Sequence, residues 1–301
     1  MLSFKKILEP EYFQNFHCTA GDCEDSCCIG WDVVIDQATY DTYQKCQDAH
    51  LKSLLCEHIL MNDKSVGDSE YVPYATVKMN HYICPFLTDE RLCTIQKTWN
   101  EDALSITCDT YPRAFNNVDG VLEQSLYVSC PEAARLILLN TKPMQFNNCE
   151  SGAEIRNSQI PIVNTKYDAH NKPHRYFGEI RAFIVSLLQD RAYPLWQRLL
   201  ILSFFCNRLE QVTPKYYDED IPYLISSFTE KIRAGEYREP MNNAGIDLEM
   251  QLQAMKFMID YRLKGEFISD QFLTCINEFM QGLCFSEGAS LDIAVRKGLS
   301  H

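Results

Sequence analysis

Four cysteines fall within eleven positions near the start of the chain, in the stretch FHCTAGDCEDSCCIGWDVVID. A second, more widely spaced set of four follows between residues 84 and 130. Thiolates are soft ligands that suit zinc or iron–sulfur clusters, and both kinds of site usually take four of them. The two sets therefore predict a metal site built from both parts of the sequence. The eight residues are Cys18, Cys23, Cys27, Cys28, Cys84, Cys93, Cys108 and Cys130.

The spacing of these cysteines bears on the kind of metal. A simple zinc ribbon has two close C-x2-C pairs, and the sequence contains no such pair. Irregular spacing favours a larger cluster, whose separate irons accept sulfurs that arrive from several directions. Cysteine is also a common buried apolar residue, so any single member of the sets can instead belong to a core. Core or surface thiols are the better interpretation for six others: Cys46, Cys56, Cys149, Cys206, Cys275 and Cys284.

Composition limits the class of protein. The chain has 301 residues, of which 46% are hydrophobic and 23% are charged, as in ordinary folded proteins. Its net charge of -13 argues against nucleic acid as a partner, because nucleic-acid binders carry a basic face. No apolar run approaches the roughly 20 residues that span a bilayer, and the N-terminus has no apolar stretch of signal-peptide length. We therefore expect a cytoplasmic protein without a membrane partner. In that reducing compartment disulfides are rare.

Hydrophobic spacing predicts the elements that position the thiols. A short strand is expected at 31–35, followed by a helix that Asp36 caps, and another helix opens at Pro131. Beyond residue 172 the pattern is that of amphipathic helices. The predicted fold is mainly α. A cysteine-rich metal-binding domain with little β occupies residues 1–150, and an all-α helical domain occupies residues 151–301.

Four sequence blocks together resemble one known family. The blocks are FHCTAGDCEDSCCIGWDVVID, CPFLTDERLC, TCDTYPR and SCPEAARL, and the match covers roughly residues 10–140. In these blocks the chain resembles the flagellin lysine-N-methylase family, within a wider group that carries a zinc- or iron-chelating cysteine cluster. The family's cysteine pattern falls on the eight cysteines named above. Tyr111, Pro112, Arg113, Pro131 and Glu132 also match the family pattern.

The resemblance implies a function. It implies a protein-lysine N-methyltransferase that takes the methyl group from S-adenosylmethionine, acts on flagellin and carries a [4Fe-4S] cluster. The sequence has no G-x-G among its 12 glycines, so the usual glycine-rich nucleotide-binding turn is missing. The common radical spacing C-x3-C-x2-C also fails, because the third position is Gly30. If S-adenosylmethionine binds, it must bind in another way.

Polar residues near the cysteines are candidates for the chemistry. A lysine must lose its proton before it attacks a methyl group, and a carboxylate or a phenol can act as the base. Asp109, Tyr111 and Glu132 are the catalytic candidates, and Arg113 is the candidate partner for a cofactor carboxylate. Each also has a structural interpretation, as a helix cap, a packed ring or a carbonyl ligand. Trp31 and Asp36 are expected to support the site.

Two other classes of function compete with the methyltransferase. One is a nonenzymatic adaptor that binds zinc or a cluster and holds a partner with its helical half. The other is a redox or metal-handling protein that uses the thiols for electron transfer or delivery. The metal discriminates between them, because zinc alone favours the adaptor, whereas an iron–sulfur cluster favours either of the other two functions.

Overall fold

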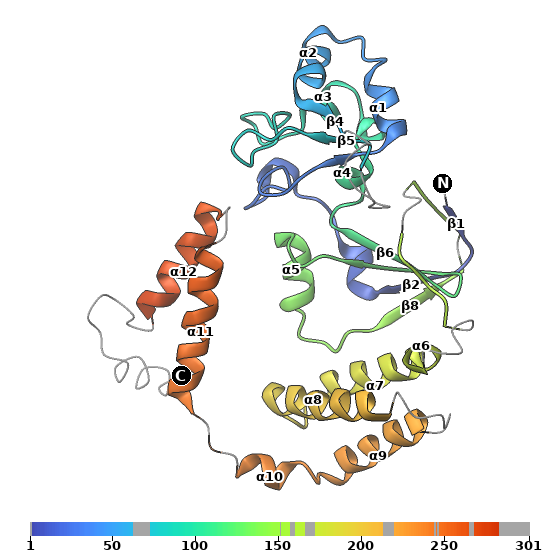
Figure 1. The fold of residues 1–301 in the computed structure, drawn as a ribbon, viewed down its shortest axis with the longest axis vertical. Coiled ribbons are helices and arrows are strands. Elements are labelled where there is room, and N and C mark those ends of the chain that lie inside the picture. Colours follow the sequence, from blue (N-terminus) through green and yellow to red (C-terminus); the bar gives the residue numbers. More distant parts are fainter. Residues whose placement is uncertain are drawn as a thin grey trace. The chain divides into compact units, whose positions relative to one another are not determined.

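The computed structural model describes residues 2–62, 73–150, 152–156, 160–165, 172–212, 220–243, 245, 247–264 and 268–282. The chain forms two compact units, each assembled from three of its segments (Figure 1). The first, here called the sheet unit, comprises Met1–Phe16, Arg113–Leu126 and Arg135–Gly245. The second, here called the cysteine unit, comprises His17–Pro112, Tyr127–Ala134 and Ile246–His301.

A five-stranded mixed sheet lies in the sheet unit, with the strand order β10-β6-β7-β2-β8 (Figure 1). Its β2–β7 and β10–β6 pairs are parallel, and its other two pairs are antiparallel. A separate two-stranded sheet pairs β1 with β9. The strands are β1 (Leu2–Phe4), β2 (Ile7–Pro10), β6 (Arg113–Val118), β7 (Val121–Leu126), β8 (Phe146–Cys149), β9 (Ala153–Ile155) and β10 (Ile162–Val163).

The β6–β7 hairpin is encoded locally by its turn. Asp119 and Gly120 lie between the paired residues Val118 and Val121. Both turn residues are left-handed, with φ of 52° and 84°. A type I′ turn requires such angles, and an Asp-Gly pair supplies them at low cost. Thr165 donates from its backbone N–H and its hydroxyl to the Asp119 carboxylate, which ties the chain after β10 to this turn.

Helices of the sheet unit share one apolar core. Phe183, Phe205 and Phe228 come from three successive helices, and their ring centroids lie 4.4 Å to 6.3 Å apart. Tyr193 is 1% exposed, and its hydroxyl donates to the Ile232 carbonyl at 2.8 Å. Buried aromatic rings contribute large apolar areas, so these contacts hold the helices together. The helical segments are η1 (Glu11–Asn15), α6 (Lys172–Arg175), α7 (Phe177–Gln189), α8 (Leu195–Val212), α9 (Asp220–Ala234) and α10 (Arg238–Asn242).

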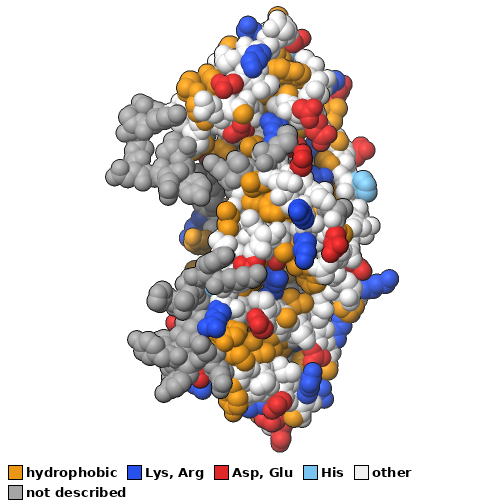
Figure 2. Space-filling view, turned by 90° about the vertical axis from the view of Figure 1, so that its right-hand side faces the viewer, with side chains coloured by type: hydrophobic (Ala, Val, Ile, Leu, Met, Phe, Trp, Pro, Cys, Tyr) orange, Lys and Arg blue, Asp and Glu red, His pale blue; other side chains and the backbone are white. Residues whose placement is uncertain are grey.

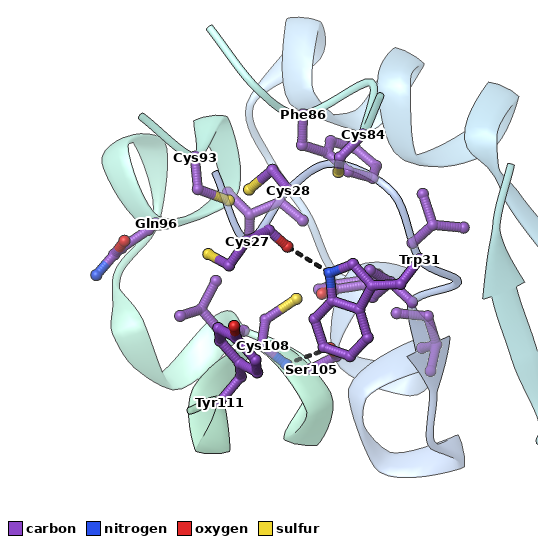
Figure 3. Close-up of a pocket in the computed structure, with 16 residues that line it drawn as sticks. Cys27, Cys28, Trp31, Cys84, Phe86, Cys93, Gln96, Ser105, Cys108 and Tyr111 are labelled. Carbon is purple, nitrogen blue, oxygen red and sulfur yellow. Dashed lines mark hydrogen bonds between the residues drawn. The ribbon is translucent and has the colours of Figure 1, made fainter. Parts of the chain in front are cut away.

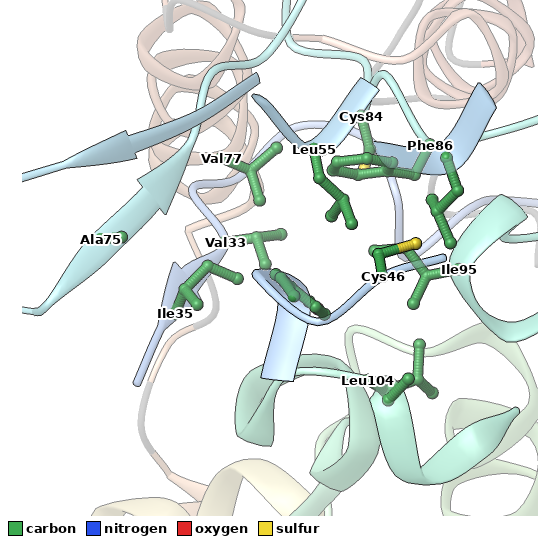
Figure 4. Close-up of a cluster of buried hydrophobic side chains, with 13 residues drawn as sticks. Val33, Ile35, Cys46, Leu55, Ala75, Val77, Cys84, Phe86, Ile95 and Leu104 are labelled. Carbon is green, nitrogen blue, oxygen red and sulfur yellow. The ribbon is translucent and has the colours of Figure 1, made fainter. Parts of the chain in front are cut away.

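The cysteine unit has a core of its own (Figure 4). Ile35, Leu51 and Phe86 are each 1% exposed and pack there with Cys46 and Cys84. A small antiparallel sheet in the order β3-β5-β4 lies beside this core. The elements are η2 (Ala20–Asp22), β3 (Val34–Ile35), α1 (Gln37–Tyr43), α2 (Ala49–His58), β4 (Ile59–Met61), β5 (Ala75–Val77), α3 (Thr94–Thr98), η3 (Glu101–Ala103), α4 (Ile106–Thr110), α11 (Leu248–Leu263) and α12 (Asp270–Gly282). Helix α5 (Pro131–Leu138) begins in this unit and ends in the sheet unit.

The predicted fold class is wrong. The N-terminal half does not have little β, because β2, β6, β7 and β8 form most of the five-stranded sheet. The second half is not all-α either, since its β9 and β10 pair with β1 and β6. Apart from β6 and β7, the strands have only two to four residues, too few to show a period-2 pattern in the sequence. The strands β6 and β7 have six residues each, but neither alternates regularly between buried and exposed positions. The predicted domain boundary at residue 150 states that the two halves fold independently. The grouping of the chain into compact units does not test independent folding, so this boundary stays a prediction.

The surface shows charges of both signs. On the face drawn in Figure 2, lysine and arginine side chains are interspersed with acidic ones and form no extended basic patch among the described residues. Within the described ranges, every helix is too short or too polar to cross a lipid bilayer.

Candidate functional site in the cysteine unit

Five of the eight predicted cysteines line one cavity of about 90 Å³ in the cysteine unit (Figure 3). They come from both sequence sets, and we call them the inner thiols. Apolar and aromatic side chains, among them Trp31, Phe86 and Tyr111, form much of the remaining wall. Sulfurs from distant parts of the sequence thus meet in a largely apolar pocket. The inner thiols are Cys27, Cys28, Cys84, Cys93 and Cys108.

Backbone pairing brings the two sequence sets together. The Cys84 N–H donates to the Cys28 carbonyl at 2.8 Å, and Ile29 forms an isolated antiparallel bridge with Ile83. The Gly30 N–H donates to the Tyr82 carbonyl at 2.8 Å. These contacts hold the two loops side by side over several residues. The structure therefore brings an early and a late cysteine together at Cys28 and Cys84, and their role as metal ligands stays a prediction.

Two short helices present the other late thiols. Cys93 is the N-cap of α3, where its side chain makes no capping hydrogen bond, and burial raises its pKa although the nearby N–H groups of Gln96 and Ile95 lower it. Cys108 lies in the first turn of α4, where the N-cap Ser105 accepts from the Cys108 N–H at 3.2 Å. Unpaired N–H groups at helix starts need such acceptors. Both late cysteines therefore lie at helix starts, and at α4 the Ser105 cap holds the Cys108 backbone in place.

Several loop residues around the thiols adopt left-handed backbone angles without being glycine. Ala20 follows Cys18 by two positions, and Arg91 precedes Cys93 by two, with φ of 50° and 60°. His81 and Tyr82 precede Cys84 with φ of 48° and 68°. Such angles cost on the order of 1 kcal/mol or more per residue and persist where the surroundings impose them, which is common at functional sites.

Four of the inner thiols have raised pKa values, which favour their protonated form; they are Cys27, Cys28, Cys93 and Cys108. A hydrogen bond with Cys28, followed by desolvation, raises the pKa of Cys27 far above its ordinary value. The same bond lowers the pKa of Cys28, but its own bond to Cys84, burial and the neighbouring thiols outweigh this and raise it to about 12. Burial raises the pKa of Cys108 to about 11. Cys27 and Cys108 both line the cavity and are exposed.

The other three predicted cysteines form a second group, here called the outer thiols. The pKa of Cys130 is raised by desolvation, against hydrogen bonds from the Ala133 and Glu132 N–H groups, and the nearby sulfurs of Cys23 and Cys18 raise it further. Cys130 directly precedes α5, so its sulfur accepts from the first N–H groups of that helix. The Cys18 sulfur accepts from the Ala20 N–H at 3.4 Å. The outer thiols do not line the cavity of the inner ones.

An aromatic pair lies at the edge of the thiol cavity (Figure 3). The rings of Trp31 and Tyr111 have centroids 5.3 Å apart. The Trp31 indole N–H donates to the Cys27 carbonyl at 2.6 Å, which supports the predicted supporting role of Trp31. The Tyr111 hydroxyl and Ser129 Oγ are 3.1 Å apart. Desolvation raises the pKa of Tyr111, with Cys130, Cys27 and Asp25 adding to the shift, so its hydroxyl stays protonated at neutral pH.

The remaining predicted residues lie at different places. Asp109 is in the first turn of α4, close enough to Cys108 to raise its pKa. Glu132 is in the first turn of α5, beside Cys130. Arg113 begins β6 in the sheet unit, where its guanidinium lies 5.5 Å from the centre of the Phe16 ring. Tyr111 and Asp109 thus adjoin the inner thiols, whereas Arg113 belongs to the other unit.

Sequence reasoning missed two serines that hold the site. Ser105 caps α4 and also bonds the Cys108 sulfur, and Ser129 pairs with Tyr111. Ser105 directly precedes the helical stretch ITCDT. Serine before such a segment is a favoured N-cap, so this signal was available. Ser129 has no comparable signal, because its partner is 18 residues away.

The sulfur atoms of the inner thiols are the kind of ligand that binds a soft metal. Five sulfurs exceed the four that zinc or an iron–sulfur cluster usually takes, and the apolar wall would exclude water from such a group. In the placement described here, however, no three cysteine, histidine, aspartate or glutamate side chains among the described residues are arranged to hold one metal ion. Thiols that share S–H hydrogen bonds carry protons, whereas a metal binds thiolates. The arrangement described here is therefore that of the protonated thiols.

The chain is similar to known proteins across almost its whole length. A family profile described as the FliB lysine N-methylase C-terminal domain matches residues 181–297. The lysine-N-methylases of Salmonella choleraesuis and Salmonella typhimurium are each 23% identical over 294 residues, which cover 95% of this chain and 69% of theirs. The flagellar biosynthetic protein FliU of Salmonella muenchen is 30% identical over 179 residues, 60% of this chain and 95% of its own. No solved structure matches the chain.

Proposed function

Because this chain belongs to the flagellin lysine-N-methylase family, we propose that it transfers methyl groups from S-adenosylmethionine to lysine side chains of flagellin. The observation that carries the proposal is the coincidence of two findings. The similarity to lysine-N-methylases extends over 95% of the chain, and five of the eight cysteines in the family pattern line one cavity. A chance similarity of helices would not bring these residues together.

The metal group we propose for the inner thiols is a [4Fe-4S] cluster, with zinc as the alternative. Cys28, Cys84, Cys93 and Cys108 come from four separate positions of the cavity wall and are the best candidates to hold it, with Cys27 as a fifth donor. When bound, such a cluster supplies a redox-active and Lewis-acidic centre. The outer thiols would keep the neighbouring loop in place.

The protein side chains beside the cavity supply proton handling. The raised pKa of Tyr111 makes it a hydrogen-bond donor at neutral pH and a poor base. Asp109 and Glu132 are therefore the better candidates to accept the lysine proton, which must leave before the nitrogen attacks a methyl group. Trp31 and Tyr111 would cover the aliphatic part of a substrate lysine and exclude water. Arg113 remains a candidate for a cofactor carboxylate.

The proposed compartment is the cytoplasm. The cysteines of the described parts are free thiols. A reducing compartment keeps thiols in that state and leaves them available to a metal. Detection of methylated flagellin in cytoplasmic extracts, before assembly of the filament, would test this assignment.

The first experiment combines metal analysis with an activity assay. The chain is purified without oxygen, its absorption spectrum and metal content are recorded, and flagellin is incubated with it and S-adenosylmethionine before mass spectrometry. We expect iron and acid-labile sulfide, and methylated lysines. Cys28→Ala should remove both the metal and the activity, whereas Cys56→Ala, an exposed cysteine on α2, is the matched control and should change neither.

Other outcomes of the same experiment support the alternatives. Stoichiometric zinc with no methyl transfer would support a nonenzymatic adaptor. An intact cluster that is reduced and reoxidised without methyl transfer would support a redox protein. Unmodified lysines in the presence of cluster-loaded protein and bound S-adenosylmethionine would refute the methylase proposal.

Glu132→Gln separates two roles of this side chain. If Glu132 only favours the positive end of α5, the variant should lose about 1 kcal/mol or less of stability and keep its activity. If it accepts the lysine proton, turnover should fall by roughly a hundredfold or more while the metal is retained. We expect the second result at unchanged metal content. Arg135→Gln, on the same helix, is the control for an unspecific effect on α5.

A further inference from the structure

The sheet unit contains a second, larger cavity, of about 670 Å³, between its five-stranded sheet and helix α7. Leu8, Asn116 and Glu123 are paired in one cross-strand row, so they share a face of the sheet, and all three line the cavity. The adjacent paired residues Ile7 and Leu122 point to the opposite face, where they belong to an apolar core. A sheet face that a helix covers is normally apolar. Here the covered face is only partly apolar, since Asn116 and Glu123 lie beside Leu8, and it borders a cavity.

The wall that α7 contributes is also built from residues that leave space. Gly178, Ala182 and Ser186 recur every four positions, and therefore lie on one face of the helix. A Cβ atom added at Gly178 would meet no atom within 4 Å. Glycine lowers helix stability relative to alanine, and packing here does not require it. Its missing side chain keeps the cavity open.

An ion pair provides charge on two sides of the cavity. Arg181 Nη1 and Glu123 Oε2 are 2.5 Å apart, and these side chains are 38% and 18% exposed. The guanidinium also lies 4.9 Å from the centre of the Phe177 ring. Gln189 Nε2 donates to the Met144 carbonyl at 2.9 Å, which orders the far wall. A guanidinium binds carboxylates in a planar, bidentate way, and a carboxylate accepts hydroxyl or ammonium groups.

We infer that this cavity binds a nucleoside-sized ligand that carries a carboxylate and hydroxyl groups, the class to which S-adenosylmethionine belongs. Its volume is within the range of roughly 300–1,000 Å³ of small-molecule sites, whereas the thiol cavity, at about 90 Å³, is too small for a nucleoside. Arg181 contacts the carboxylate, and Glu123 accepts the hydroxyl groups. Leu8, Val185 and Phe146 provide apolar walls for the flat base. The inference rests on the proposed function, which requires a place for the methyl donor.

Three variants of the full-length protein test the site by calorimetric titration with S-adenosylhomocysteine. Gly178→Leu adds a side chain to the cavity wall at a position where a Cβ atom meets no protein atom within 4 Å, and should weaken binding by about tenfold or more with an unchanged melting temperature. Gly245→Leu is the matched control, because a Cβ there also meets no atom within 4 Å and the residue does not line the cavity. It should bind as the unchanged protein does. Arg181→Gln removes the carboxylate partner and should also weaken binding by about tenfold.

A second ligand separates the role of Arg181 from damage to the fold. Methylthioadenosine has the same nucleoside but no carboxylate, so its affinity should be equal in Arg181→Gln and the unchanged protein. Equal loss of affinity for both ligands would overturn the assignment of Arg181.

If Gly178→Leu bound S-adenosylhomocysteine normally in a preparation that methylates flagellin, this inference would be wrong and the proposed function would stand. If Gly178→Leu lost only the binding of a lysine-bearing flagellin peptide, the cavity would be a peptide site. If the unchanged protein neither bound the donor nor methylated flagellin, both proposals would fail.

Discussion

At the scale of single residues, four of the five inner thiols are potential ligands whose raised pKa values favour the protonated form. Their hydrogen bonds run from Cys27 to Cys28 and from Cys28 to Cys84, and each bond favours a proton on one of its sulfurs. A metal must displace these protons before it binds. Metal loading should therefore become easier as the pH rises.

The pKa of Cys108 leads to a prediction about alkylation. Because burial raises this pKa to about 11 from its ordinary value of 9.0, the reactive thiolate is scarce at pH 8. In metal-free protein the iodoacetamide reaction at Cys108 should accelerate as pH rises, with a midpoint near 11. Peptide mass spectrometry at a series of pH values measures the rate of alkylation at Cys108. Cys56, exposed on α2, is the internal control and should react first; equal rates for the two thiols at pH 8 would contradict the prediction.

At the scale of elements, short helices and turns position the thiols through side-chain caps. Ser105 caps α4, and Asp36 caps α1 by accepting from the Thr39 N–H at 2.9 Å and from the Thr39 hydroxyl. Asp36 was expected from the sequence to open a helix, and the structure confirms it. Helices this short have little stability of their own, so each cap contributes much of what keeps them formed.

Removal of the Asp36 cap should loosen α1 locally. Asp36→Ala is expected to cost about 1 kcal/mol, because the Thr39 N–H and hydroxyl lose their acceptor and Thr39 is 1% exposed. Hydrogen exchange of the α1 amides should accelerate by roughly fivefold. Asp41→Ala, an exposed position in the same helix, is the control and should leave exchange unchanged or slightly slower. No difference between the two variants would show that the cap does not hold α1.

At the scale of the whole molecule, the chain passes repeatedly between two units with separate cores. Metal binding is coupled to folding where the ligands come from different segments. All eight predicted cysteine ligands belong to the cysteine unit. The metal should therefore stabilise that unit first.

Removal of the metal by a chelator tests this division. Hydrogen exchange should accelerate in the core of the cysteine unit, for example around Leu51, and remain unchanged around Phe205 in the sheet unit. Equal acceleration of hydrogen exchange in both units would contradict this division. Cys206→Ala should keep its metal, because Cys206 lies on α8 in the sheet unit. Cys275→Ala should also keep its metal, because Cys275 on α12 belongs to the cysteine unit but does not line the thiol cavity. Cys284 lies outside the described residues.

Local chemistry explains what the sequence determined by itself. The clustering of cysteines and the spacing of the late set indicated thiol chemistry and the family. Asp36 and Pro131 marked helix starts at Gln37 and Pro131, and the helical pattern after residue 172 predicted the helices of the second half. Caps and amphipathic helices depend on neighbours within a few positions, so the sequence is sufficient for them.

Only the tertiary structure decided which thiols meet and that a mixed sheet forms. Five cysteines share a cavity because the loop at Cys28 pairs with the loop at Cys84, 56 positions later in the numbering. The sheet forms because β2, only four residues long, pairs with β7, which begins at Val121. Such short strands carry no detectable periodicity, and their pairing partners are chosen by contacts between distant segments. The cavity between the sheet and α7 has the same origin, since it exists only once Glu123 and Arg181 lie across from each other.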